Sequence, residues 1–158
     1  MAPQRLGQHF LAGASWRERI ARLEKSGRPK EAIRAFLAEI IDRSLDDPDR
    51  KGCLLVNSAL DVAPHDAEIG RVIAGCFAEL RAFFRRNLEA ARAAHQVPRQ
   101  TEPDELAGHL LGVVLGVRVL ARTGANRAQL EAVARPALRL LAMPRRPRRK
   151  ASPRRLHS

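Results

Sequence analysis

The stretch 66-DAEIGRVIAGCFAELRAFFRRNLEAARAAH-95 carries the longest uninterrupted pattern in this sequence. Its apolar residues recur every three or four positions from Ile69 to Ala91, which is the spacing that aligns side chains on one face of an α-helix. Asp66 stands where an N-cap residue would accept hydrogen bonds from the first turn. The stretch therefore predicts one amphipathic helix that ends near His95 and is about 45 Å long, at roughly 1.5 Å per residue.

Shorter helical patterns flank this long one on both sides. They are bounded by residues that favour helix ends, such as Pro29 in a first turn and Gly124 after a last turn. No segment alternates between apolar and polar residues with period two, so no strands are expected. The predicted fold class is all-α, a single antiparallel helical bundle of about six helices. The other five helices are expected at about residues 15–26, 29–46, 51–62, 102–122 and 126–142.

Three helix starts and one helix interruption can be predicted from single residues. The helix starts are marked by Ser15, Thr101 and Asn126, whose side chains can cap a helix. An acid or an amide follows each of them three positions later, as in a capping box. Pro136 falls inside the last predicted helix, where a proline removes one hydrogen bond and clashes with the previous turn, at a cost of about 3 kcal/mol. A kink or a break is expected there.

The composition allows one domain with a basic extension. A chain of 158 residues with 45% hydrophobic residues is long enough for a single well-buried core. Much of its net charge of +12 comes from residues 143–158, which contain seven lysines and arginines and no acid. This segment is expected to be a disordered tail, because cations and prolines cannot build a core. The tail either stays solvated or binds nucleic acid or anionic lipid without sequence preference.

The sequence offers no recognisable catalytic or metal-binding arrangement. It lacks a nucleophile with a nearby base, paired carboxylates on an apolar face and a glycine-rich phosphate loop. Cys53 and Cys76 do not have the spacing of zinc ligands or redox cysteines, so no metal and no cofactor are expected. The most apolar window, residues 106–121, is too short to span a membrane and includes a histidine and an arginine. We therefore expect a cytoplasmic protein that is not an enzyme and contacts no membrane.

Three segments carry a distinctive combination of residues. They are GCLLVNSALDVAPHD (52–66), AEIGRVI (67–73) and ELAGHLLGVVLGVRVLARTGANRAQLEAVARPALRLL (105–141). Together they resemble the C-terminal domain of TetR-family transcriptional regulators, over about residues 28–142. The resemblance implies a helical domain that forms a homodimer through its last two helices and encloses a pocket for a small hydrophobic effector. It also implies that a separate N-terminal helix-turn-helix binds operator DNA.

The chain departs from this family pattern at its N-terminus. Family members carry a three-helix DNA-binding unit before this domain, whereas here only residues 1–27 precede the resemblance. These residues are interpreted as an N-terminal remnant of the connecting helix, with the DNA-binding head absent. The chain is then either a truncated or mis-started regulator or a stand-alone effector domain. Operator DNA would be bound only if a missing segment or a partner supplied a helix-turn-helix.

Glycines recur at every fourth position of the predicted helix 102–122 and leave one stripe without side chains. Each glycine costs about 1 kcal/mol relative to alanine in a helix interior, so close packing against another helix is expected to compensate. That helix belongs either to the same chain or to a second copy, and the resemblance favours a homodimer. The dimer-interface candidates are Gly108, Gly112, Leu115, Gly116, Val119, Leu130, Val133 and Leu138.

Two amides, Asn57 and Asn87, lie on the apolar faces of predicted helices. A buried amide without a partner costs about 1–3 kcal/mol, so each amide is expected to form hydrogen bonds. The partner is either structural, such as a backbone carbonyl, water or another side chain, or a ligand held in an apolar cavity. The effector-pocket candidates are Phe36, Ile40, Cys53, Asn57, Phe77, Phe84, Asn87, Leu110, Val114 and Val117.

The sequence thus predicts a TetR-like C-terminal domain that binds a small hydrophobic effector and homodimerises. Residues 28–142 form this domain, between the N-terminal remnant and the basic tail. Two functions of other classes remain open at this point. The chain is alternatively a ligand-free helical protein-interaction module, or a nonspecific nucleic-acid binder that acts through its tail.

Overall fold

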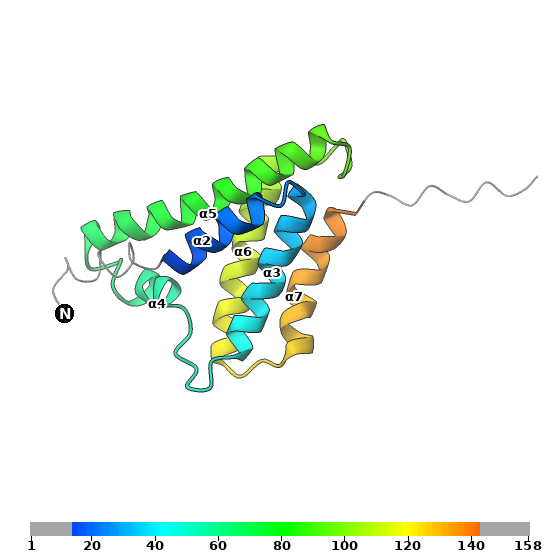
Figure 1. The fold of residues 1–158 in the computed structure, drawn as a ribbon. Helices are drawn as coiled ribbons and strands as arrows, with labels where there is room; N and C mark the ends of the chain where they lie inside the picture. Colours follow the sequence, from blue (N-terminus) through cyan, green and yellow to red (C-terminus); the bar gives the residue numbers. More distant parts are fainter. Residues whose placement is uncertain (1–13, 143–158) are drawn as a thin grey trace, which may run out of the picture.

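The computed structural model describes residues 14–142, which form six α-helices and no strand (Figure 1). The predicted all-α fold class is therefore confirmed for this part of the chain. The predicted helix positions agree with the observed ones to within three residues. The helices are α2 (Ala14–Glu24), α3 (Pro29–Leu45), α4 (Leu54–Asp61), α5 (Ala67–Ala93), α6 (Pro103–Arg122) and α7 (Arg127–Leu140).

The helix α6 lies at the centre of the bundle, where it packs against α3, α5 and α7 (Figure 1). In Figure 1, α7 runs antiparallel to α6, and the long α5 crosses the bundle obliquely. The helix α2 lies along α5 and packs on α3, whereas the short α4 lies near the start of α5. As a result, α2 and α4 cover one end of the molecule, and α3, α6 and α7 fill the other.

The centre of the core is a cluster of three phenylalanines from α3 and α5. The ring centroids of Phe36 and Phe83 lie 5.2 Å apart, and those of Phe36 and Phe84 lie 5.6 Å apart with the rings perpendicular. The second pair has the edge-to-face arrangement that aromatic rings prefer, and the rings of the first pair are tilted by 47°. Leucines and valines from α5, α6 and α7 surround the cluster and are almost fully buried. This part of the interior is solid.

Several helix ends follow the sequence signals. The Asp66 carboxylate accepts hydrogen bonds from the backbone N–H groups of Glu68 and Ile69, both at 3.0 Å, and so caps α5 as predicted. The capping box predicted at Asn126 is also present, since its side chain accepts from the backbone N–H of Gln129 at 3.0 Å. These caps satisfy backbone donors that have no partner within the helix.

Three local predictions were wrong or incomplete. The helix α4 begins at Leu54 rather than at residue 51, because Gly52 has a φ of +73° and its N–H is held by the Asp47 carboxylate at 2.6 Å. The Thr101 side chain does not cap α6, whose N-cap is Glu102 without a side-chain hydrogen bond. The helix α7 is not broken at Pro136, which lies inside a continuous helix.

The N-terminal remnant is described only from residue 14 onward. The side chain of Ser15 is not among the described ones, so its predicted capping role stays a prediction. The predicted basic tail, residues 143–158, lies entirely outside the described residues. In the part of the chain that the structure describes, none of the helices has the length and apolar character needed to cross a membrane.

Candidate functional site

A cavity of about 140 Å³ lies among α2, α3, α4, α5 and α6, at the end of the molecule away from the solid core. Most of its wall is apolar, and each of the five helices contributes side chains. The apolar wall residues are Trp16, Phe36, Ile40, Leu55, Val56, Phe77, Leu80, Val114 and Leu115. Larger hollows occur elsewhere, including one of about 340 Å³ beside His109 and Leu140, but they open widely to the surface. The more enclosed cavity is therefore the better candidate site.

Five of the ten predicted pocket residues line this cavity. They are Phe36, Ile40, Cys53, Phe77 and Val114. Three other predicted pocket residues belong to the solid core instead. Phe84, Leu110 and Val117 are almost fully buried among other core side chains and do not line the cavity.

The two amides are also placed away from the cavity. The Asn87 side chain is buried and donates to the carbonyl of Phe83 at 2.8 Å and to Oε1 of Glu24 at 3.3 Å. The Asn57 side chain donates to the carbonyl of Lys51 at 2.8 Å and accepts from Nη1 of Arg122 at 2.8 Å. Both amides thus have structural partners. Asn87 ties α2 to α5, and Asn57 ties the start of α4 to the end of α6.

Three arginines that sequence reasoning did not select line the cavity. They are Arg19 from α2, Arg43 from α3 and Arg118 from α6. Each follows an apolar wall residue at helical spacing: Arg19 after Trp16, Arg43 after Ile40 and Arg118 after Val114. This spacing on an otherwise apolar face was the signal that could have identified them.

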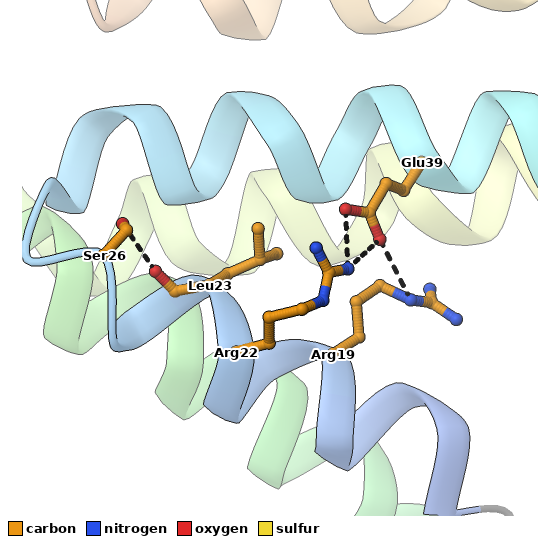
Figure 2. Close-up of polar contacts among 5 residues, drawn as sticks. All are labelled: Arg19, Arg22, Leu23, Ser26 and Glu39. Carbon is orange, nitrogen blue, oxygen red and sulfur yellow. Dashed lines mark hydrogen bonds and ion pairs between the residues drawn. The ribbon is translucent and has the colours of Figure 1, made fainter.

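Arg19 is the most buried of the three, with only 5% of its surface exposed. Its Nε pairs with Oε2 of Glu39 at 3.3 Å, and Figure 2 shows Glu39 between the guanidinium groups of Arg19 and Arg22. Nη1 of Arg19 is buried and has no hydrogen-bond partner among the described residues. Leaving a buried donor unsatisfied costs about 1–3 kcal/mol, and more when the group is charged.

The electrostatic environment of these arginines is unfavourable to their charge. Burial lowers the pKa of Arg19 below its ordinary value, the nearby cations Arg43 and Arg118 lower it further, and Glu39 opposes the shift. Burial also lowers the pKa of Arg118, whose Nη1 donates to the hydroxyl of Ser44 at 3.2 Å. Both groups stay protonated near neutral pH, because an arginine side chain loses its proton only in strongly basic solution. The cavity therefore presents concentrated positive charge beside apolar walls.

Both cysteines lie in the cavity wall as free thiols. Burial raises the pKa of the Cys76 thiol above its ordinary value, although the neighbouring Arg17 partly opposes this shift. A raised pKa keeps the thiol protonated, and a protonated thiol is a weak nucleophile. Within residues 14–142 no three His, Cys, Asp or Glu side chains are grouped as metal ligands would be. The arrangement is suited to binding rather than to covalent chemistry.

The helix α2 forms one wall of the cavity and is held by the buried side chains of Ile20 and Leu23 and by polar contacts at its ends. Arg17 pairs with Glu79 of α5 through Nε at 2.7 Å and Nη2 at 2.9 Å. Glu24 at the other end accepts from Nη2 of Arg86 at 3.0 Å. Between these ends Ile20 is buried against the core. Exposed ion pairs contribute little to stability, so α2 is fastened less tightly than the central helices.

The predicted glycine stripe of α6 has no helix packed closely on it within residues 14–142. A Cβ added at Gly108 would come no nearer than 3.8 Å to Arg81, and one at Gly116 no nearer than 3.9 Å to Val133. A Cβ added at Gly112 would meet nothing within 4 Å. The alternative of close packing inside one chain is therefore not observed for the described residues.

The other predicted interface residues have mixed positions. Val119 is 43% exposed, and Val133 and Leu138 are half-buried against the core. Leu115 is half-buried and lines the cavity instead. Leu130 is fully buried in the core of its own chain, so it has no surface to offer a second copy.

Comparisons with known proteins agree on one family. The family model described as "Tetracyclin repressor-like, C-terminal domain" matches residues 29–137. The HTH-type transcriptional regulator YezE of Bacillus subtilis (strain 168) is 33% identical over 114 residues, which are 71% of this chain and 58% of YezE. This chain thus spans little more than half the length of that relative.

Two solved structures show the same similarity in three dimensions. Both are cysteine mutants of the TetR family transcriptional regulator CifR in complex with 26-base-pair operator DNA. Each matches with a TM-score of 0.69 and 27% sequence identity. The first match covers 88% of this chain and 80% of the CifR chain, and the second covers 84% and 68%.

Proposed function

This chain belongs to the TetR family of transcriptional regulators, and we propose that its described part binds a small hydrophobic effector and forms a homodimer. The observation that carries the ligand-binding part is the cavity among α2 to α6, with apolar walls and few polar groups. Ligand sites in proteins commonly combine these two features. Operator DNA is contacted in this proposal by a helix-turn-helix that another segment or a partner supplies.

The position of α2 suggests how the effector would act. Trp16 and Arg19 project from α2 into the cavity wall, and α2 precedes the residues that match the family model. A ligand in the cavity would contact α2 directly and favour one position of this helix. In a dimer, shifting two copies of α2 would change the separation of two DNA-binding units, and so couple the effector to operator binding.

The homodimer is proposed to form through α6 and α7. Gly112 and Val119 lie on the exposed side of α6, and none of residues 14–142 would come within 4 Å of a Cβ added at Gly112, which leaves room for a second helix to approach. Two copies related by a twofold axis would bring the same surface of each chain together. Val133 on α7 lies beside Gly116 and continues this surface, whereas Leu138 lines a groove between α3 and α7.

Trp16 provides the test of ligand binding, because it is the single tryptophan of the chain and lines the cavity. We expect its fluorescence to change with saturable dependence on concentration when small hydrophobic and aromatic compounds are titrated. Leu115→Phe should fill part of the cavity and weaken this response. Leu120→Phe is the matched control, since Leu120 lies on the same helix but not in the wall. A panel that produces neither a fluorescence change nor thermal stabilisation would favour the ligand-free interaction module.

Gly112 provides the test of the dimer. By analytical ultracentrifugation we expect a mass of twice the 17.5 kDa of one chain. Gly112→Leu should yield single chains, because the added side chain would occupy the space of the second helix. Gly75→Leu is the matched control, since Gly75 is also an exposed helix glycine with nothing within 4 Å. A single-chain mass for the unmodified protein would contradict the dimer.

A further inference from the structure

The charge of the cavity wall restricts which ligands it can hold. Three guanidinium groups line a cavity of about 140 Å³, and no aspartate or glutamate is among the described residues of its wall. Glu39 neutralises part of the charge of Arg19 from outside the wall, but it is shared with Arg22. A neutral hydrophobic ligand would leave this excess of positive charge uncompensated.

Arg19 is placed to donate to a ligand. Its side chain is 95% buried, its Nε is committed to Glu39, and its Nη1 has no partner among the described residues. Because the guanidinium group is rigid and planar, the direction of Nη1 is fixed once Nε is engaged. A buried charged donor of this kind is normally satisfied by an acceptor. Arg19 lines the cavity, so its guanidinium group lies beside the space that an anionic ligand would occupy.

The two other arginines add to the same charge. Arg118 donates to the neutral hydroxyl of Ser44 at 3.2 Å, and its nearest carboxylate, Asp47, accepts from the N–H of Gly52 at 2.6 Å. Arg43 is exposed at the rim, and within residues 14–142 neither it nor Arg118 has a carboxylate oxygen within 4.0 Å. All three cations therefore retain free donor capacity at one cavity.

We propose that this cavity binds an organic monocarboxylate with a small apolar body, such as one aromatic ring or a short alkyl chain. Arginine forks match the geometry of a carboxylate, and the aromatic and aliphatic walls match the body. The volume is close to the roughly 150 Å³ of an apolar cavity known to hold benzene, which limits the ligand to about that size. This inference rests on the proposed function and specifies the chemical class of its effector.

The test compares acids with their neutral amides in the full chain. Benzoate is paired with benzamide, and hexanoate with hexanamide, because each pair has nearly the same shape and differs in charge. Binding is followed by Trp16 fluorescence near pH 7, where both acids are ionised. We expect each acid to bind at least about tenfold more tightly than its amide, as charge-assisted hydrogen bonds to a desolvated arginine predict.

Two variants test whether the arginines of the cavity cause the tighter binding of acids. Arg19→Met should weaken benzoate binding at least about tenfold and leave benzamide binding nearly unchanged. Arg22→Met is the matched control, because Arg22 shares Glu39 and lies on the same helix but does not line the cavity. It should bind benzoate as the unmodified chain does. If Arg19→Met does not fold, the exposed Arg43→Met carries the same test, with a smaller loss of benzoate affinity expected.

The outcomes separate this inference from the proposed function. Amides that bind as tightly as acids, or benzoate affinity that is unchanged in both Arg19→Met and Arg43→Met, would overturn the anionic ligand. Neutral hydrophobic compounds would then still bind if the effector cavity itself is correct. If no acid, amide or neutral compound perturbs Trp16, both the anionic ligand and the effector cavity are refuted.

Discussion

The two ends of the bundle share α3, α5 and α6 but pack them in different ways. Around Phe83 and Phe84, side chains from α3, α5, α6 and α7 pack against one another and are almost completely buried. One to two turns away on α5 and α6, Phe77 and Leu115 are only half-buried and face a cavity with three arginines on its wall. Phe36 belongs to both ends, since it contacts the phenylalanine cluster and also lines the cavity.

This difference supports our proposal that one end serves stability and the other serves binding. Filling a cavity and removing an unpaired buried charge are both common routes to higher stability. Neither change has been made at the cavity end, which keeps its cavity and the unsatisfied Nη1 of Arg19. Local departures from good packing are expected at functional sites. Each prediction below compares the two ends.

The largest effect is expected from shortening phenylalanines at the two ends. Phe83→Ala should lower the free energy of unfolding by about 3–5 kcal/mol, because Phe83 is fully buried in a part of the core that cannot collapse around the lost ring. Phe77→Ala should cost only about 1–2 kcal/mol, since Phe77 is half-buried beside an existing cavity. Urea unfolding followed by circular dichroism measures both values. Equal losses would remove the distinction between a solid end and a hollow end.

A smaller effect is expected at the two amides. Asn87→Ala should lower the free energy of unfolding by about 1–2 kcal/mol, because a buried side chain with two hydrogen bonds is lost. Asn57→Ala should cost about 1 kcal/mol or less, since Asn57 is only half-buried. Neither variant should change ligand affinity measured by Trp16 fluorescence. Loss of ligand binding in either variant would place the amides at the site after all.

Arg19→Met should raise the free energy of unfolding, whereas the substitutions above lower it. We expect the free energy of unfolding to rise by up to about 1 kcal/mol, because a buried charge is removed while Glu39 keeps its pairing with Arg22. Since the pKa of Arg19 is lowered in the folded state, the penalty exists at every pH below that pKa. The gain should therefore be the same at pH 5 and pH 9. A clear loss of stability would show that Arg19 is a structural residue.

The smallest effect is expected where α2 is fastened to α5. The hydrogen bonds from Arg17 hold the pKa of Glu79 below its ordinary value, so this contact stabilises the folded state above about pH 4.5 and is lost as the pH falls through the lowered pKa. Because the Glu79 side chain is 51% exposed, the contribution should be only a few tenths of a kcal/mol. Glu79→Gln should remove this part of the acid dependence in urea titrations at pH 3 and pH 7. A loss above about 1 kcal/mol would mean that α2 is held more tightly than we infer.

The fold could be predicted from the sequence because periodicity and caps act locally. The apolar spacing of α5 and the capping residues Asp66 and Asn126 specify helices without reference to the rest of the chain. The start of α4 was missed because it depends on Asp47, which holds the backbone of Gly52. Thr101 was misassigned for a related reason, since a capping motif in the sequence does not ensure that the side chain turns toward the helix.

The site was harder to predict than the fold. Periodicity identifies an inward face but does not say whether that face meets other side chains or a cavity, and so Phe84 and Val114 could not be told apart. The amide Asn87 was selected because amides are unusual on apolar faces, although its partners come from distant residues. The arginines were passed over because charged residues are usually exposed. Arg118 was the strongest available signal, since it lies within the most apolar window of the sequence, residues 106–121.

The crystal structure of the full chain grown with benzoate would test most directly that the hollow end is the ligand site. The account predicts benzoate inside the cavity, with its carboxylate within hydrogen-bonding distance of the guanidinium group of Arg19 and its ring against Phe36 and Phe77. An empty cavity at saturating benzoate, or benzoate bound only elsewhere on the chain, would contradict it.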